Sequence, residues 1–502
     1  MASAAEAHAQ LVTALREHAD LAAALHLLEW DQETFMPSAA AEARARQIGT
    51  LAALLHERQT TPGFLQLVDE LAERVSELDP QQAVDARETK WRLDRKRRLD
   101  VALVRERSTI HAQARAVWVT ARRDDDFAAL APWLGRIVEI ERRVAATIDA
   151  SRDAYDVLLE GYEPGASAGM IESLFGELRQ ALLPLVNRLR ARLAARPLPA
   201  GALCGDFPLD AQRRFNQCIA AALGFDFSRG RLDEAVHPFT TGIGDDVRIT
   251  TRYDARDLRC SLYSTLHETG HALYEQGLDR EAWGTPRGAS CSFGIHESQS
   301  RLWENQIGRS EAFWKHFLPK ACELFPGLVA ASLDAVVLAA NEARPSLIRT
   351  EADDITYNLH IILRFELERA LLAGDVDVGA LPQIWREKMR AYLGLSPDTD
   401  REGVLQDVHW ASGAFGYFPT YALGNIYAAQ LLRAARADIG SIDALVSAGE
   451  FHVLLQWLRQ HVHRLGQTYR PAELIRVVTG EPPTPRPLFE YLEGRLAFIE
   501  ST

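Results

Sequence analysis

The chain has 502 residues, of which 47% are hydrophobic and 25% charged, a composition that excludes a largely disordered or fibrous protein. It carries 56 Lys and Arg against 69 Asp and Glu, a formal net charge of −13 at pH 7. Because nucleic acids and anionic membrane surfaces select basic faces, this balance argues against either as the main partner.

The N-terminal residues 1–21 are alanine-rich and amphipathic, without the basic start and continuous apolar run of a signal peptide. The five cysteines include no CxxC pair, so we expect free thiols in a reducing, cytoplasmic compartment. Residues 408–432 contain no Asp, Glu, Lys or Arg, but they hold His409, a proline and three glycines. This stretch is therefore expected to form a buried protein wall and not a membrane span.

Apolar residues at helical spacing dominate the chain and predict a mainly α-helical fold. The basic residues of segment 90–98 number six in nine positions, and we interpret the segment as a solvated helix face. A grip on an acidic ligand is the alternative. A stretch rich in proline and glycine, residues 196–208, is the best candidate for a break between a helical sub-lobe, 1–195, and a core, 209–502.

Residues 237–253 differ from this helical pattern. They contain β-branched runs on either side of Gly-Ile-Gly-Asp-Asp, which is typical of a β-hairpin and predicts a small antiparallel sheet. The exposed edge of such a sheet can hydrogen-bond an extended peptide by strand addition. A purely structural hairpin is the equally supported alternative.

Residues 262–277 contain an HExxH arrangement made of His267, Glu268 and His271, within an apolar pattern that predicts a helix. Residues four apart share a helix face, so both histidines can bind one ion while Glu268 reaches a water beside it. Gly270 costs a helix about 1 kcal/mol relative to alanine, which indicates that another segment approaches closely. Two histidines on the surface or at a cap of a helix are the alternative.

A catalytic zinc site needs a third protein ligand. Glu297 lies 26 positions after His271 and precedes a stretch with helical spacing. As the third ligand it would complete a site of two histidines and one glutamate, with a position left for water. Its neighbour His296 would point elsewhere on a helix, and we interpret it as a core histidine or a partner of a ligand.

Six motifs in order support a more specific prediction, together with an opening segment at 30–37. They are residues 237–239, 246–250, 267–271, 296–299, 348–353 and 403–410. With these segments the chain resembles the carboxypeptidase Taq family of metallocarboxypeptidases over nearly its whole length. The resemblance implies a large, two-lobed helical fold around a deep groove lined by the small sheet. It also favours residues 1–502 as one catalytic domain.

The resemblance implies that His267, His271 and Glu297 bind the metal and that Glu268 is the general base and acid. It implies one Zn²⁺ per chain, for which Co²⁺ can substitute, a homodimer, and peptide substrates with a free C-terminus. Arg349 matches the arginine that grips the terminal carboxylate, a role suited to a planar guanidinium. A structural ion pair with a nearby carboxylate, Glu351 or Asp353, is the alternative, and Asp353 can instead support a metal-binding histidine.

His409 and Tyr421 match groups that donate to the developing oxyanion, and an uncharged wall would strengthen such donors. Tyr421 and its neighbour Tyr417 can instead be core aromatics. The resemblance places His237 and Arg248 in substrate binding, although Arg248 can equally brace the sheet.

The sequence thus predicts a metal-dependent carboxypeptidase that releases C-terminal amino acids by attack of activated water. A zinc oligopeptidase or dipeptidyl carboxypeptidase with the same ligands is the first alternative. A helical peptide-binding protein without catalysis is the second.

Overall fold

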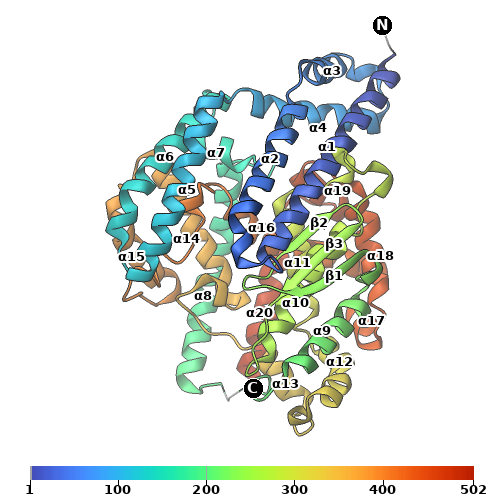
Figure 1. Cartoon of the computed structure of the whole chain (residues 1–502). Helices are drawn as coiled ribbons and strands as arrows, with labels where there is room; N and C mark the ends of the chain where they lie inside the picture. The colour runs from blue at the N-terminus through green and yellow to red at the C-terminus, as the bar shows by residue number, and fades with distance from the viewer. Residues whose placement is uncertain (1–2, 199–200) are drawn as a thin grey trace.

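The computed structural model describes residues 3–198 and 201–502 and is mainly α-helical, as predicted (Figure 1). The helices before the predicted break are α1 (Ala4–Glu33), α2 (Ala41–Gln59), α3 (Pro62–Glu73), α4 (Pro80–Arg97), α5 (Val101–Asp124), α6 (Phe127–Asp149), α7 (Ala154–Leu159) and α8 (Ala168–Ala195). Those after it are α9 (Leu209–Leu223), α10 (Leu258–Glu275), α11 (Phe293–Arg301), α12 (Glu311–Leu324), α13 (Leu333–Ala340), α14 (Asp354–Ala373), α15 (Leu381–Leu393), α16 (Pro419–Ile439), α17 (Ile442–Ala448), α18 (Phe451–His461), α19 (Pro471–Thr479) and α20 (Arg486–Ser501).

Local capping explains where the helices that carry the site begin. The side chain of Asp257 accepts a hydrogen bond from the Arg259 amide at the start of α10, and that of Ser292 accepts one from Ile295 in α11. At α14 the Asp353 carboxylate accepts from two amides of the first turn. Such caps satisfy backbone donors that have no partner within the helix. The HExxH segment is therefore helical, as predicted.

The sheet consists of β1 (Gly230–Glu234), β2 (Thr240–Ile243) and β3 (Asp246–Thr251), in the order β1-β3-β2. The predicted hairpin is confirmed, since β2 and β3 pair antiparallel. Gly244 makes their turn possible because its φ of 63° lies in the left-handed region.

The predicted small sheet is present, but it is mixed and not antiparallel throughout, because β1 pairs parallel with β3. Residues 230–234 read Gly-Arg-Leu-Asp-Glu and contain neither a β-branched nor an aromatic residue, so β1 has no strand signal in the sequence. The pairing arises from tertiary structure, and it leaves β2 as an edge strand next to α1 and α10.

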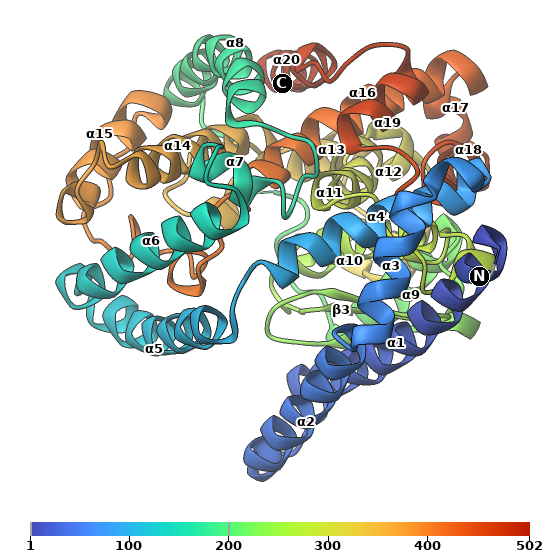
Figure 2. The same cartoon turned by 90° about the horizontal axis from the view of Figure 1, so that it is seen from above.

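A large hydrophobic core extends from Leu103 to Ile499 and includes residues of both α8 and α9, on either side of the predicted break. A smaller core holds α1, α3 and α4 together through Leu11, Val68 and Leu93. The sub-lobe boundary at 196–208 stays a prediction. From above, α1 and α2 extend along one side of the molecule, while α5 and α6 lie on another (Figure 2).

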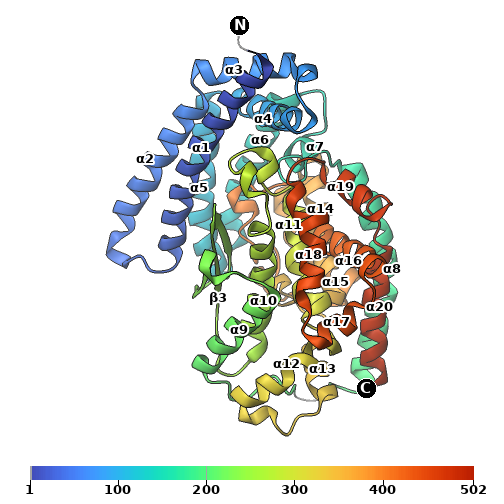
Figure 3. The same cartoon turned by 90° about the vertical axis from the view of Figure 1, so that its right-hand side faces the viewer.

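The uncharged stretch 408–432 runs into α16, which packs against α11, α14 and α20. Most side chains in the first part of this helix are buried, as expected for a protein wall. Helix α20 lies beside α8 at the edge of the molecule away from the sheet (Figure 3). Within the described part of the chain, every helix is too short or too polar to span a bilayer.

Candidate active site

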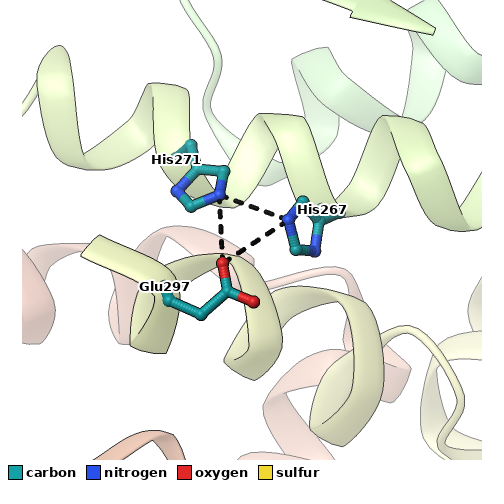
Figure 4. Close-up of side chains that lie close together, drawn as sticks. All are labelled: His267, His271 and Glu297. Carbon is teal, nitrogen blue, oxygen red and sulfur yellow. Dashed lines mark hydrogen bonds and ion pairs between the residues drawn. The ribbon is translucent and has the colours of Figure 1, made fainter. Parts of the chain in front are cut away.

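His267 and His271 on α10 face Glu297 on α11 (Figure 4). The two histidine Nε2 atoms are 3.2 Å apart, and Glu297 Oε2 lies 3.7 Å from His267 Nε2 and 3.5 Å from His271 Nε2. One ligand atom from each residue lies within 4.8 Å of the other two. Two imidazoles and a carboxylate around one point suit a divalent metal such as zinc.

The close approach of α10, α11 and α16 depends on two glycines. A Cβ on Gly270 would lie 2.6 Å from the Gln299 carbonyl oxygen, so the close contact inferred from the sequence is confirmed. On the other side of α11, a Cβ on Gly424 would lie 2.4 Å from Glu297 Cγ. Helix α11 is therefore held between two backbones, and this fixes where Glu297 points.

Further side chains orient each histidine from behind. His267 Nδ1 lies 2.8 Å from Glu304 Oε2, and Glu304 belongs to a π-helical turn, η6 (Leu302–Ile307), that follows α11. His271 Nδ1 lies 2.5 Å from His296 Nδ1, and the other nitrogen of His296 lies 2.8 Å from Glu275 Oε1. Partners on Nδ1 leave both Nε2 atoms free to face a metal.

The electrostatics favour a charged carboxylate and a neutral imidazole. Burial opposes ionisation of Glu297, but Arg301, whose Nε donates to Glu297 Oε1 over 2.7 Å, and His267 hold its pKa far below the usual range. Burial and the neighbouring His296 lower the pKa of His271 to about 3. Burial also acts against protonation of His267, yet Glu297 and Glu304 raise its pKa. These carboxylates would equally attract a metal cation.

Glu268 lies on α10 beside the candidate ligands and is 6% exposed. Its Oε2 accepts a hydrogen bond of 2.6 Å from Thr240 Oγ1 on the edge strand β2. Burial raises the pKa of Glu268 above its ordinary value. A carboxylate with a raised pKa is a stronger base, as proton transfer requires.

These four residues line a cavity of about 780 Å³. Its walls come from α1, α4, β2, α10, α11 and α16, with Thr240, Thr241 and Gly242 contributing the outer edge of the sheet. Tyr417 and Tyr421 also line it, from the uncharged stretch. The cavity is large enough for several residues of a peptide.

His409 lies behind this wall, outside the cavity lining, with its Nε2 3.3 Å from the Tyr421 hydroxyl. Burial raises the pKa of Tyr421 well above its ordinary value, so the phenol keeps its proton and can donate it in a hydrogen bond. Burial also lowers the pKa of His409 to about 4, which keeps this imidazole neutral. The pair is thus arranged with Tyr421 towards the cavity.

Arg349 is 6% exposed and lies outside the cavity lining. Its Nη2 donates to Asp407 Oδ1 over 2.8 Å, and its guanidinium lies 5.0 Å from the centre of the Tyr421 ring. Its ion-pair partner is thus Asp407 and neither Glu351 nor Asp353. Asp353 caps α14, and the carboxylate that contacts His267 is that of Glu304 and not that of Asp353. The structure therefore places Arg349 behind Tyr421.

Arg248 and His237 are not brought to the candidate metal ligands. Arg248 forms an ion pair of 2.6 Å with Asp246, and its guanidinium lies 4.2 Å from the centre of the Trp30 ring. His237 is exposed, and only the residues that follow it, from Pro238 on, line the cavity. Arg248 thereby connects the sheet to α1.

Sequence reasoning missed Arg301, Glu304, Thr240 and Asp407. Arg301 and Glu304 follow Glu297 by four and seven positions, so their helical spacing placed them on its face and could have indicated them. Thr240 and Asp407 meet their partners only through the tertiary fold. Asp407 lies within the motif 403–410, but nothing local in the sequence indicates that it pairs with Arg349.

The comparisons with known proteins agree with this geometry. A family model described as Carboxypeptidase Taq (M32) metallopeptidase matches residues 10–496. The chain is 43% identical over 505 residues to thermostable carboxypeptidase 1 of Thermus thermophilus, covering 98% of this chain and 99% of that protein. It is 40% identical to carboxypeptidase 1 of Bacillus subtilis, with 94% of each chain covered.

Among solved structures, the M32 carboxypeptidase of Deinococcus radiodurans R1 superposes with a TM-score of 0.96 at 39% identity, covering 99% of this chain and 100% of that one. A carboxypeptidase of Pyrococcus furiosus superposes with a TM-score of 0.94 at 36% identity, covering 98% and 99%. The resemblance drawn from the motifs is confirmed, and with it the predicted metallocarboxypeptidase function. The chain belongs to the carboxypeptidase Taq (M32) family of metallopeptidases.

Proposed function

We propose that this protein releases C-terminal amino acids from peptides at a zinc site formed by His267, His271 and Glu297, with Glu268 as general base and acid. The observation that carries the proposal is the convergence of three ligand atoms within 4.8 Å, next to a buried carboxylate in a cavity with an open strand edge. The donor set of two nitrogens and one oxygen suits Zn²⁺, and Co²⁺ accepts the same ligands.

A divalent metal held there would act as a Lewis acid and make water easier to deprotonate. Glu268 takes the proton from the attacking water, because its raised pKa makes it a competent base. It then gives the proton to the leaving amine. Thr240, which donates to Glu268 Oε2, holds the carboxylate in the orientation that both transfers need.

Tyr421 is proposed to donate to the oxygen that gains charge as the peptide carbonyl is attacked. Its hydroxyl is protonated and lies on the cavity wall, while His409 behind it fixes the orientation of the phenol. Such donors are effective where water is excluded and the local dielectric is low.

Substrate binding is proposed to use β2 and Arg349. The outer edge of β2 borders the cavity, so an extended peptide can pair with its free backbone groups. Arg349 would act on the terminal carboxylate in one of two ways. It would position Tyr421, behind which it lies, or it would leave its ion pair with Asp407 and bind the carboxylate directly. Arg248 would support substrate binding indirectly, through its contact with Trp30 on α1. His237 would do so through the residues that follow it, which line the cavity from Pro238 on.

Two peptides of identical sequence, one with a free and one with an amidated C-terminus, test the proposal. We expect single amino acids to be released in order from the free peptide, and the amide to be cleaved at least ~100-fold more slowly, because it lacks the charge that an arginine binds. Equal turnover of both would identify an oligopeptidase, and release of dipeptides would identify a dipeptidyl carboxypeptidase.

A cytoplasmic location and a homodimer complete the proposal. The described cysteines are all free, which suits a reducing compartment. The homodimer rests on the family resemblance, and sedimentation analysis of the purified protein tests it directly.

A further inference from the structure

The basic segment 90–98 on α4 contains one arginine that differs from its neighbours. The other cations have partners: Lys90 bonds to Asp94 over 2.6 Å, Arg95 to Glu160 over 3.2 Å, and Arg97 to Asp69 over 2.9 Å. These pairs fit a helix face that serves the fold. Arg92 has no ion-pair or hydrogen-bond partner within the described part of the chain.

Arg92 is exposed, and the surface it faces is the catalytic cavity. It lines the same 780 Å³ space as the three metal ligands and Glu268, next to Trp91 from the same helix. A guanidinium that is exposed to a cavity and free of partners can bind a ligand there without first breaking an ion pair.

The surroundings of Arg92 carry an excess of positive charge. One helical turn earlier, the buried Glu88 accepts from Arg87 Nε over 3.1 Å and lies 3.1 Å from Arg470 Nη1. Arg470 also lines the cavity, and its guanidinium packs 4.5 Å from the centre of the Trp91 ring. Glu88 and Arg470 both act on Arg92 electrostatically. The single negative charge of Glu88 is therefore shared among the guanidiniums of Arg87, Arg92 and Arg470.

The acidic groups on the other walls of the cavity do not compensate for this excess. Three of them are engaged: Glu268 with Thr240, Glu275 with His296, and Glu297 with Arg301. Glu29 on α1 is exposed and forms no ion pair or hydrogen bond with a described residue, so it does not neutralise Arg92 through a direct contact. The part of the cavity lined by Glu88, Arg92 and Arg470 thus keeps a net positive charge, although the protein as a whole has a net charge of −13.

We propose that Arg92, with Arg470 held beside it by Glu88 and Trp91, forms a subsite that binds a carboxylate of the peptide substrate. A guanidinium binds a carboxylate bidentately, and the aromatic rings of Trp91 and Tyr162 line the same cavity. The carboxylate is either that of an acidic side chain, with Arg349 acting on the terminal one, or the terminal one itself, bound here in place of Arg349. The inference rests on the proposed function, because it names a feature of the substrate.

The test compares wild type with Arg92→Gln on free peptides that end in three alanines, and on variants in which each alanine in turn is replaced by glutamate. Loss of a charge-assisted hydrogen bond predicts a KM increase of roughly 10- to 100-fold with kcat nearly unchanged. If the subsite binds the terminal carboxylate, KM rises for every peptide. If it binds an acidic side chain, KM rises only for the peptide with glutamate at the matching position.

Arg97→Gln is the matched control, since Arg97 lies on the same helix, is exposed, and is absent from the cavity lining. Arg92→Lys keeps the charge without the planar fork and should fall between wild type and Arg92→Gln. Changes of less than about twofold with every peptide in Arg92→Gln would overturn the inference.

Peptide binding to metal-loaded Glu268→Gln, measured by calorimetry with and without Arg92→Gln, separates the inference from the proposed function. A weaker Kd on loss of Arg92 supports the subsite even where turnover is absent, and an unchanged Kd contradicts it. Absence of any hydrolysis by wild type would contradict the proposed function alone.

Discussion

Glu304 shows how single side chains beyond the ligands shape the site. Its carboxylate lies 2.8 Å from His267 Nδ1 and 3.3 Å from Arg301 Nη1. Burial opposes its ionisation, yet Arg301 and His267 lower the pKa of Glu304 to about 2. The ionised carboxylate orients the imidazole and increases its basicity, as partners of metal-bound histidines generally do.

Glu304→Gln should therefore weaken metal binding by about 10- to 100-fold while leaving the fold intact, because an amide retains the size but not the charge. The apparent Kd for Zn²⁺, measured by competition with a chelator, checks this. Glu172→Gln, at an exposed ion pair on α8, is the control and should bind metal like wild type. Equal metal affinity of Glu304→Gln and wild type would contradict a role of Glu304 in metal binding.

Glu163 is a second buried carboxylate near the site, 1% exposed, and it accepts a hydrogen bond of 3.0 Å from the Gly294 amide at the start of α11. Burial raises its pKa to about 7. The native state therefore holds a proton that the unfolded state loses near pH 4.5, and stability falls as pH rises from there to about 7.

Glu163→Gln removes this dependence, since glutamine can still accept from Gly294 and can donate to Tyr427, whose hydroxyl lies 3.0 Å from Glu163 Oε1. Relative to wild type, the free energy of unfolding of the variant should rise by about 3 kcal/mol between pH 5 and pH 8. Denaturant titrations at the two pH values check this. A difference that stays constant with pH would contradict the assignment.

At the scale of elements, α11 is the part on which the site depends most. It lies between α10 and α16, and the two glycines at 270 and 424 allow these helices to approach it. The close contact at Gly270 was predictable, because a glycine within the helical HExxH segment lowers helix stability and so indicates another requirement. The second was not, since Gly424 gains its meaning only from a partner 127 positions earlier, at Glu297.

Gly270→Ala should destabilise the protein by about 1–3 kcal/mol and weaken metal binding, because overpacking against α11 outweighs the helix propensity gained. Gly176→Ala on α8 is the matched control, as nothing lies within 4 Å of its added Cβ. That variant should be neutral or stabilised by up to about 1 kcal/mol. Thermal unfolding of both, with and without Zn²⁺, checks the comparison, and equal effects would contradict the close-contact argument.

The small sheet shows the limits of local patterns. The hairpin of β2 and β3 was predictable from its turn and β-branched residues. Strand β1 was not, because its residues are mostly polar and its parallel partner comes from the fold. Likewise, the family resemblance assigned Arg349 to substrate binding, but its burial against Asp407 behind Tyr421 could be known only from the structure.

At the scale of the whole molecule, the cavity joins segments from both ends of the chain. Its lining includes His26 on α1 and Arg470 next to α19, and the proposed metal ligands lie between them in the sequence. The motifs predicted this breadth in outline, because they already extended from Trp30 to Trp410. For the basic segment on α4, a grip on an acidic ligand was only the alternative prediction, since a basic run on a helix usually faces solvent.

Removal of metal should affect the molecule as a whole, because the proposed ligands connect α10 to α11. Dialysis against a chelator should abolish peptide hydrolysis and lower the Tm, and stoichiometric Zn²⁺ should restore both, since a ligand that binds only the native state stabilises it. A chelated protein with full activity would contradict a metal-dependent mechanism.

The central claim is that Glu268 moves the proton while His267, His271 and Glu297 hold the metal. Its most direct test is Glu268→Gln, assayed for metal content and for release of the C-terminal amino acid from an unblocked peptide. We predict wild-type metal content with turnover reduced by roughly 100- to 10,000-fold, because general base catalysis is lost and the ligands are not. Unchanged turnover in a variant that binds metal normally would contradict the account.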